Sequence, residues 1–284
     1  MTKQTDWLFR FCNAIKKEEI KMISNDRLLN IPVTPFTSFQ NCIECILKLL
    51  SNSDKNKYSI FTPNVHHFYL YNSDSEMKKA YDSCTLSLID GMPLVWTYRL
   101  LKKRKVVKVS GSDVFSYLLP ILVKKNKKIF LLGGEEGVAK NAVNNLCSDI
   151  NHRIFTYSPP FGFEKKSNQN YIILDKINKI KPDILFVAFG APKQEKWIYA
   201  NLKKINAKIA IGVGGSFDFA AGIQKRAPVW MQKLSLEWFY RLLCNPKRLF
   251  KRYLITNSFF ILILMFEVLK MTISKICRHK IFRR

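Results

Sequence analysis

The stretch Asp183–Val213, DILFVAFGAPKQEKWIYANLKKINAKIAIGV, decides the fold. Its two ends are short apolar runs, Asp183–Phe189 and Lys208–Val213, which are typical of strands buried on both faces of a parallel sheet. The segment Gln194–Lys203 between them has the apolar spacing of a helix. Strand, helix and strand in this order predict a right-handed crossover unit.

The same alternation runs through the chain from about Tyr58 onward. Further strands are expected at Tyr58–Thr62, Thr85–Asp90, Lys128–Leu132 and Arg153–Tyr157. Further helices are expected at His66–Tyr81, Pro93–Leu101, Asp113–Lys125, Val138–Ile150 and Gln169–Ile180. These elements predict an α/β, Rossmann-like fold, in which a mainly parallel sheet carries helices on both faces. Such sheets bind ligands beyond the carboxyl ends of their strands.

The chain divides into three predicted segments. Residues 1–26 form a variable N-terminal lead that lacks the apolar core of a signal peptide. Residues 27–240 form the Rossmann-like domain, with an edge strand or hairpin at Arg27–Thr37 and a helix from about Trp230 to Leu243. Residues 241–284 form a basic, helical C-terminal appendage that associates with a membrane.

The charge of the chain favours a polyanionic partner, because the formal net charge is +26. From Arg241 to the end, eleven Lys or Arg residues face one acid, Glu267, which gives +10 over 44 residues. The other +16 is spread through lysine-rich helices and is typical of a solvated surface. Nucleic acid, anionic lipid and a phosphorylated substrate all remain possible partners on charge alone.

The segment Leu254–Leu269 is apolar at its centre and has basic residues on both sides. As a helix of 16 residues it would be about 24 Å long, which is shorter than the ~30 Å hydrocarbon core of a bilayer. We therefore expect it to lie in the inner leaflet, held by cations on either side. A tilted transmembrane span and a buried core or dimer helix are the alternatives.

Cys42 and Cys45 stand in a C-x-x-C spacing inside a helical pattern from Phe39 to Leu50. Because no second such pair follows, reduced cysteines in a helix are favoured over a metal or redox site.

Several polar residues and glycines follow directly after predicted strands. Asp90 ends an apolar run and precedes Gly91, so it can be a general base with a raised pKa or the cap of the next helix. Gly133 and Gly134 stand between a strand and a helix, where backbone N–H groups can face a phosphate. The glycine spacings of dinucleotide-binding and P-loop proteins are missing from the sequence.

Separated short motifs follow one another in a fixed order. Upstream they are Thr62-Pro63-Asn64, Ile89-Asp90-Gly91 and Lys108-Val109-Ser110-Gly111-Ser112-Asp113. Downstream they are Pro192-Lys193-Gln194-Glu195, Gly212-Val213-Gly214-Gly215, Phe217-Asp218-Phe219, Arg226-Ala227-Pro228, Glu237-Trp238, Arg241-Leu242 and Asn245-Pro246-Lys247-Arg248. Over about residues 27–253 these motifs resemble the WecG/TagA/CpsF glycosyltransferases, family 26.

The resemblance implies roles for individual residues. Asp90 would be the catalytic base, Thr62 would position substrate, and Asn64 would hydrogen-bond the donor or acceptor. Lys108, in one motif with Gly111, would neutralise a diphosphate, although the family usually has Arg there and lysine loses the bidentate fork. Gln194 would lie at the nucleotide. Asp218 can cap a turn or bind the donor. Glu195 is expected in the first turn of a helix, where an acidic side chain is favourable. Asp113 is expected to cap its helix.

Protein cations are expected to take the place of a metal ion. The sequence has no D-x-D pair of the kind that holds a divalent cation on a sugar nucleotide, and no metal or cofactor is expected. In the family, appendage arginines fold over the active site, and Arg241 and Arg248 match them best. Candidates to bind the acceptor or a diphosphate are Arg226, Arg241, Arg248 and Lys251. A basic patch that only faces the membrane is the alternative.

The implied reaction is inverting transfer of a hexose or N-acetylhexosamine from a UDP-sugar to a polyprenyl-diphosphate-linked sugar. N-acetylmannosamine and undecaprenyl-diphosphate-GlcNAc are the best-described donor sugar and acceptor of the family, and capsular branches use other hexoses. The expected location is the cytoplasmic face of the cell membrane, as a peripheral or monotopic protein that can be a homo-oligomer. A nucleic-acid-binding protein is the rival class, but no motif for it is present; an inactive scaffold of the same fold is a further alternative.

Overall fold

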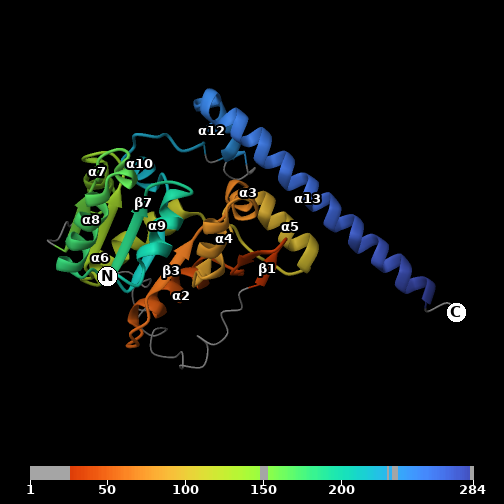
Figure 1. Ribbon diagram of the computed structural model, residues 1–284, viewed down its shortest axis with the longest axis horizontal. Helices are drawn as coiled ribbons and strands as arrows, with labels where there is room; N and C mark the ends of the chain where they lie inside the picture. The colour runs from red at the N-terminus through yellow and green to blue at the C-terminus, as the bar shows by residue number, and fades with distance from the viewer. Residues whose placement is uncertain (1–25, 148–152, 229, 232–235, 282–284) are drawn as a thin grey trace.

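The computed structural model describes residues 26–147, 153–228, 230–231 and 236–281, with backbone alone at Ser167, Arg248 and 275–281. Almost all of the predicted N-terminal lead, residues 1–26, therefore lies outside the described residues. The body of the protein is an α/β domain, and a single long helix extends from it (Figure 1).

The central sheet has six strands, all parallel, in the order β4-β3-β8-β7-β5-β6. Their bounds are β3 Tyr58–Phe61, β4 Leu86–Ser87, β5 Ile129–Gly133, β6 Ile154–Tyr157, β7 Ile184–Ala188 and β8 Ile209–Gly212. A separate antiparallel hairpin pairs β1 (Asp26–Leu28) with β2 (Ile31–Val33). The parallel sheet and the hairpin predicted for residues 27–37 are confirmed.

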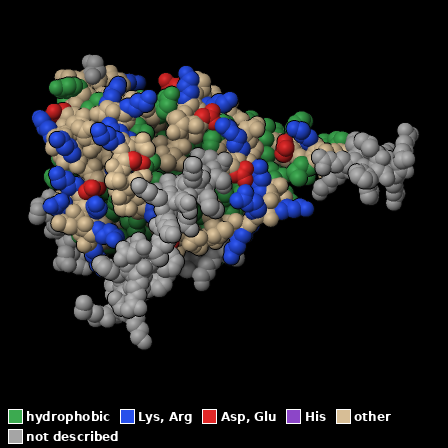
Figure 2. All heavy atoms as spheres, turned by 90° about the horizontal axis from the view of Figure 1, so that it is seen from below, with side chains coloured by type: hydrophobic (Ala, Val, Ile, Leu, Met, Phe, Trp, Pro, Cys, Tyr) green, Lys and Arg blue, Asp and Glu red, His purple; other side chains and the backbone are tan. Residues whose placement is uncertain are grey.

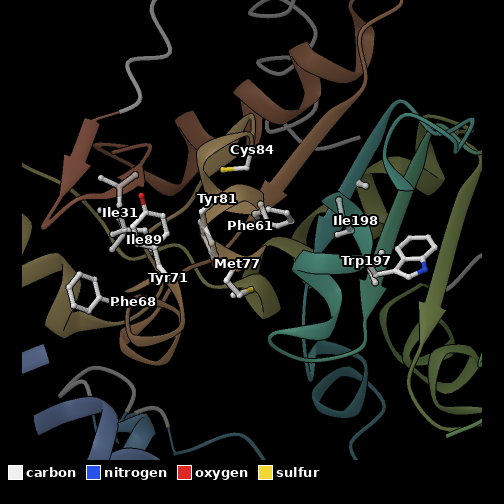
Figure 3. Close-up of a cluster of buried hydrophobic side chains, with 14 of the residues drawn as sticks. Ile31, Phe61, Phe68, Tyr71, Met77, Tyr81, Cys84, Ile89, Trp197 and Ile198 are labelled. Atoms are coloured by element: carbon white, nitrogen blue, oxygen red, sulfur yellow. The ribbon is translucent and has the colours of Figure 1, made fainter. Parts of the chain in front are cut away.

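Helices cover both faces of the sheet because successive strand residues point to opposite faces. In β7, Leu185 and Val187 join one core cluster, and Ile184 and Phe186 join the other. The first cluster is shared with α3 (Val65–Ser73), α4 (Ser75–Asp82), α5 (Met92–Lys102), α8 (Ser167–Ile180) and α9 (Lys193–Asn201), and Figure 3 shows part of it. The second is shared with α2 (Phe39–Ser51), α6 (Gly111–Lys124), α7 (Val138–Leu146) and α10 (Ser216–Ala220).

Side-chain caps set several helix boundaries. Asp74 accepts hydrogen bonds from the backbone of Glu76 and Met77, so the helix predicted at 66–81 is two helices, α3 and α4. Ser110, not Asp113, caps α6, because its hydroxyl accepts from the Asp113 N–H. The expectation that Asp113 caps its helix is therefore wrong. The short turn η2 (Phe163–Lys165) and α10 were not predicted.

The C-terminal part begins with α12 (Glu237–Cys244), which Pro246 separates from α13 (Pro246–Ile281). At 36 residues, α13 is about 54 Å long, whereas the prediction gave it 16 residues at 254–269. Within α13, residues 249–274 are long and apolar enough to cross a membrane. The argument that this helix is too short for a span is therefore wrong.

Contacts between aromatic rings join α13 to the domain. The ring of Phe260, which is buried, meets the ring of Phe68 on α3 edge-to-face at 5.2 Å, and Phe259 meets Tyr69 at 5.4 Å. Beyond these contacts the helix projects from the body with hydrophobic side chains exposed on it (Figure 2). The appendage therefore has one end fixed to the core and one end outside it.

Candidate active site

A pocket of about 720 Å³ lies beyond the carboxyl ends of β3 and β4, under α12 and α13. The domain contributes Asn64, His66, Asp90, Lys108 and the start of α5 to its wall. Helices α12 and α13 contribute Glu237, Trp238, Arg241, Arg252, Tyr253, Thr256, Asn257, Phe260, Ile261 and Leu264. The structure thus brings together Asp90, Asn64, Lys108 and Arg241, four of the residues predicted from the sequence.

Asp90 is held in place by backbone hydrogen bonds of its own loop. Its N–H donates to the Pro63 carbonyl at 2.8 Å, and the neighbouring Ile89 carbonyl accepts from the Val109 N–H at 2.8 Å. The N-cap of α5 is Gly91, at φ 110°, and no side chain caps this helix. The alternative that Asp90 is the cap is therefore excluded, and its carboxyl group faces the pocket.

The electrostatics of the pocket suit a general base. Burial raises the pKa of Asp90 to about 6, with Glu237 and Asp113 adding to the rise, while Lys108 and Arg241 oppose it. A carboxyl group with this pKa is mostly ionised at neutral pH, yet is a stronger base than an ordinary aspartate. The shift comes chiefly from loss of solvent, in a wall that also carries cations.

Glu237 on α12 organises the cations around Asp90. Its carboxylate contacts Lys108 Nζ at 3.3 Å, Arg226 Nε at 3.6 Å and Arg241 Nη2 at 3.8 Å. Arg226 is not part of the pocket lining, and it pairs with Asp113. Arg241 also lies over the ring of Phe219, 4.8 Å from its centroid, which ties α12 to the domain.

Position on α13 decides which of its basic residues reach the pocket. Lys251 is exposed and outside the pocket lining, whereas the next residue, Arg252, lines it. The side chain of Arg248 lies outside the described residues. Arg252 was not among the residues predicted from the sequence. It stands in a row with Thr256, Phe260 and Leu264, spaced four apart on the pocket-lining face of α13, and that row alone does not indicate what the face meets.

A chain of buried polar groups runs away from the pocket behind Asn64. Asn64 caps α3 with its side-chain oxygen, which also lies 2.9 Å from His67 Nδ1. His67 Nε2 lies 3.3 Å from the fully buried carboxylate of Glu195, which accepts from Gln194 Nε2 at 2.7 Å. Gln194 Oε1 in turn accepts from the Gly214 N–H at 2.9 Å. This network, which sequence reasoning missed, braces Asn64 from behind.

The adjacent residues His66 and His67 face different surroundings, because consecutive residues of a helix point in different directions. His66 lines the pocket, and His67 faces Glu195. Burial, with help from His67 and Arg252, lowers the pKa of His66 to about 4. At neutral pH the His66 ring is therefore an uncharged hydrogen-bonding group in the pocket wall.

The remaining predicted residues lie at the ends of β5, β7 and β8, outside the pocket lining. Gly133 has φ 105°, and a Cβ there would come within 2.7 Å of the Ala188 carbonyl oxygen. Gly134 is also left-handed, and its N–H donates to that same carbonyl at 3.3 Å. Asp218 lies in the first turn of α10, where its backbone carbonyl closes the next turn by accepting from the Ile223 N–H.

Thr62 and Gly111 lie between these two regions. Thr62 is buried, and its Oγ1 would be 3.3 Å from a Cβ placed on Gly111; the Val213 backbone would be equally near. The ends of β3 and β8 and the start of α6 therefore meet at Gly111, where only a glycine fits comfortably. Gly214, which follows Val213 in the chain, is the residue whose N–H donates to Gln194.

The cysteine pair lies in α2, as predicted. Cys42 is buried and Cys45 half-buried, and burial raises the pKa of the Cys45 thiol to about 11. Among the residues that the structure describes, His, Cys, Asp and Glu form no group of three that could hold a metal ion.

A parallel sheet with a basic pocket and a buried carboxyl group at its strand ends is the arrangement of an α/β enzyme. The model of the glycosyl transferase WecG/TagA/CpsF family matches residues 27–273. The chain therefore belongs to this family.

The chain is similar to proteins of three species that are named N-acetylglucosaminyldiphosphoundecaprenol N-acetyl-beta-D-mannosaminyltransferase. The protein from Bacillus subtilis (strain 168) is 40% identical over 58% of this chain and 63% of its own length. That from Bacillus spizizenii is 35% identical over the same shares. That from Staphylococcus aureus (strain MRSA252) is 28% identical over 75% of this chain and 82% of its own length. The match thus spans less than two thirds of the two Bacillus proteins.

Proposed function

We propose that this protein is an inverting glycosyltransferase that moves N-acetylmannosamine from a UDP-sugar to undecaprenyl-diphosphate-linked GlcNAc. The observation that carries the proposal is Asp90, a carboxyl group with a pKa raised to about 6 in a pocket with Lys108, Arg241 and Arg252. The names of the relatives support the choice of donor sugar and acceptor.

The reaction is a single displacement. The Asp90 carboxylate takes the proton of the acceptor hydroxyl, whose oxygen attacks the anomeric carbon from the face opposite the nucleotide. The bond from that carbon to the diphosphate oxygen breaks, and UDP leaves with the bonding electrons. One carboxylate is sufficient, since no covalent sugar–enzyme intermediate forms.

Charge on the departing diphosphate is stabilised by Lys108 and Arg241, without a metal ion. Both cations lie in the pocket wall, and Glu237 holds them there through contacts of 3.3 and 3.8 Å. Cations fixed in advance need no reorganisation as charge develops. Gln194 contributes indirectly in this proposal, by ordering the loop at Gly214 with its side-chain amide.

We further propose that the enzyme works on the cytoplasmic face of the cell membrane, held by α13. The exposed hydrophobic side chains of this helix, among them Leu262, Met265 and Phe266, support membrane contact over binding to nucleic acid. Recruitment of the protein to anionic vesicles is better tested by the substitutions Leu262→Ser and Phe266→Ser than by deletion of the helix. A deletion after Tyr253 would also remove Phe260, which is part of the core.

The test is UDP release from a panel of UDP-sugars, with a lipid-diphosphate-GlcNAc acceptor and EDTA present. We expect acceptor-dependent turnover with UDP-N-acetylmannosamine, and a loss of about 10²- to 10⁴-fold in Asp90→Asn. Asp175→Asn, an exposed carboxylate on α8 that pairs with Lys179, is the control and should keep full activity. Full activity in Asp90→Asn would refute the role of Asp90, and dependence on a divalent cation would refute the role of the protein cations.

A further inference from the structure

The pocket changes character along its length. Around Asp90 its wall carries charged and polar groups, namely Asn64, His66, Lys108 and Arg241. Farther along, between α5 and α13, the wall is made by Met92, Trp96, Leu100, Phe260, Ile261 and Leu264. We call this second part the apolar groove. The Thr97 hydroxyl and the Trp96 indole N–H are the hydrogen-bonding groups that the side chains of α5 add to the described lining.

Both walls of the apolar groove expose hydrophobic area at one edge. Trp96 and Leu100 are 54% and 58% exposed, and they stand four residues apart on the same face of α5. Across from them Ile261 is 54% exposed, on a part of α13 that continues into its projecting apolar end. Exposed hydrophobic area of this kind on a soluble face is costly, so it indicates a hydrophobic occupant or surface.

We propose that the apolar groove binds the first isoprene units of the acceptor's lipid chain, and that α5 forms one wall of this lipid site. This inference rests on the proposed function and deepens it. It assigns Trp96 and Leu100, which belong to the catalytic domain, to acceptor recognition. The membrane-facing surface then includes α5 as well as the appendage.

The order of groups along the pocket matches the order of groups in such an acceptor. An isoprenoid chain needs apolar contact alone, the diphosphate needs cations, and the terminal sugar hydroxyl must reach a base. Along α5 the lining runs from Met92, two residues after Asp90, to Leu100, and along α13 it runs from Arg252 to Leu264. The apolar residues therefore extend away from the end of the pocket that holds Asp90 and Arg252. A nucleotide or a free sugar would leave the groove without a partner, since both require hydrogen-bonding groups there.

The test compares two exposed isoleucines that differ in their place in the fold. Ile261, which is 54% exposed, lines the apolar groove, whereas Ile223, which is 59% exposed, lies outside the pocket lining and outside α13. Ile261→Asn, Ile223→Asn and Leu100→Asn are compared in detergent micelles as full-length proteins. The acceptors are GlcNAc-diphosphate carrying either an undecaprenyl chain or a methyl group. We expect Ile261→Asn and Leu100→Asn to lower kcat/KM about tenfold with the long chain and not with the methyl acceptor.

Ile223→Asn should match the wild type with both acceptors. Equal losses with both acceptors, or equal behaviour of the Ile261 and Ile223 variants, would overturn the proposal. A second measurement, quenching of tryptophan fluorescence by a sugar-free prenyl diphosphate, separates this proposal from the proposed function. Binding that is weakened in Ile261→Asn alone, without sugar transfer by the wild type, would retain the groove and refute the activity. Absence of binding by the wild type would overturn the groove, whatever the activity.

Discussion

Ionisation of Asp90 is expected to control activity through a single titration. With a pKa of about 6, the carboxyl group is about one-tenth ionised at pH 5, half at pH 6 and nine-tenths at pH 7. Only the ionised form accepts a proton, so kcat/KM should rise about tenfold from pH 5 to its plateau. An aspartate with an ordinary pKa would show no change over this range.

Two substitutions next to Asp90 should move this titration in opposite directions. Glu237 raises the pKa of Asp90, so Glu237→Gln should shift the midpoint down and increase the relative rate at pH 5. Lys108 lowers the pKa, so Lys108→Met should shift the midpoint up. Because Lys108 and Glu237 contact each other at 3.3 Å, each substitution also changes the other group's surroundings.

The assay is initial UDP release at subsaturating substrate from pH 4.5 to 8.5, with every profile normalised to its own plateau. Normalisation separates a change in the titration from a change in the stabilisation of the diphosphate. The reasoning is refuted if the wild-type midpoint lies below pH 5, or if both substitutions move it in the same direction.

Three further predictions concern stability. Asp90→Asn should stabilise the fold, since a raised pKa means that the ionised carboxylate of the native state costs stability above pH 6 and not below pH 4. The gain in the free energy of unfolding, on the order of 2 kcal/mol, should appear in thermal unfolding as the pH rises from 4 to 7. Gly133→Ala should cost at least about 2 kcal/mol in urea unfolding, because of its positive φ and the Ala188 carbonyl, and a neutral result would contradict the observed backbone. Glu195→Ala should cost about 3 kcal/mol by removing the buried partner of His67, with Glu195→Gln milder.

The sheet could be predicted because its strands are buried on both faces and therefore form continuous apolar runs. The apolar run at Ile184–Ala188 stands between a charged turn and a glycine, and it predicts a strand. The order of the strands in the sheet could not be predicted, because the sequence does not show beside which strand each crossover connection places the next one. The length of α13 was misjudged because only its apolar part, residues 254–269, was taken as the helix, whereas one continuous helix runs from Pro246 to Ile281 through the basic residues on both sides.

The candidate site was partly accessible from sequence. Asp90 and Asn64 follow adjacent parallel strands, and the ends of such strands must lie side by side. Gln194 and Asp218 follow other strands and lie outside the described pocket, which depends on sheet order. The contribution of α5 and of Arg252 requires the packing of α13 on Phe68, a contact between distant segments that no local pattern encodes.

The continuity of α13 would give the proposed membrane-bound enzyme a fixed geometry relative to a bilayer. Arg252, in the pocket wall, and Leu269, on the projecting end, stand 17 residues apart on one helix, or about 25 Å along its axis. In the proposed membrane-bound state, a helix fixed to the domain at Phe260 and immersed at its far end would set the distance between Asp90 and the lipid headgroups. One extra turn between Phe260 and Leu269 would move the immersed end about 5 Å farther from the pocket along the helix axis.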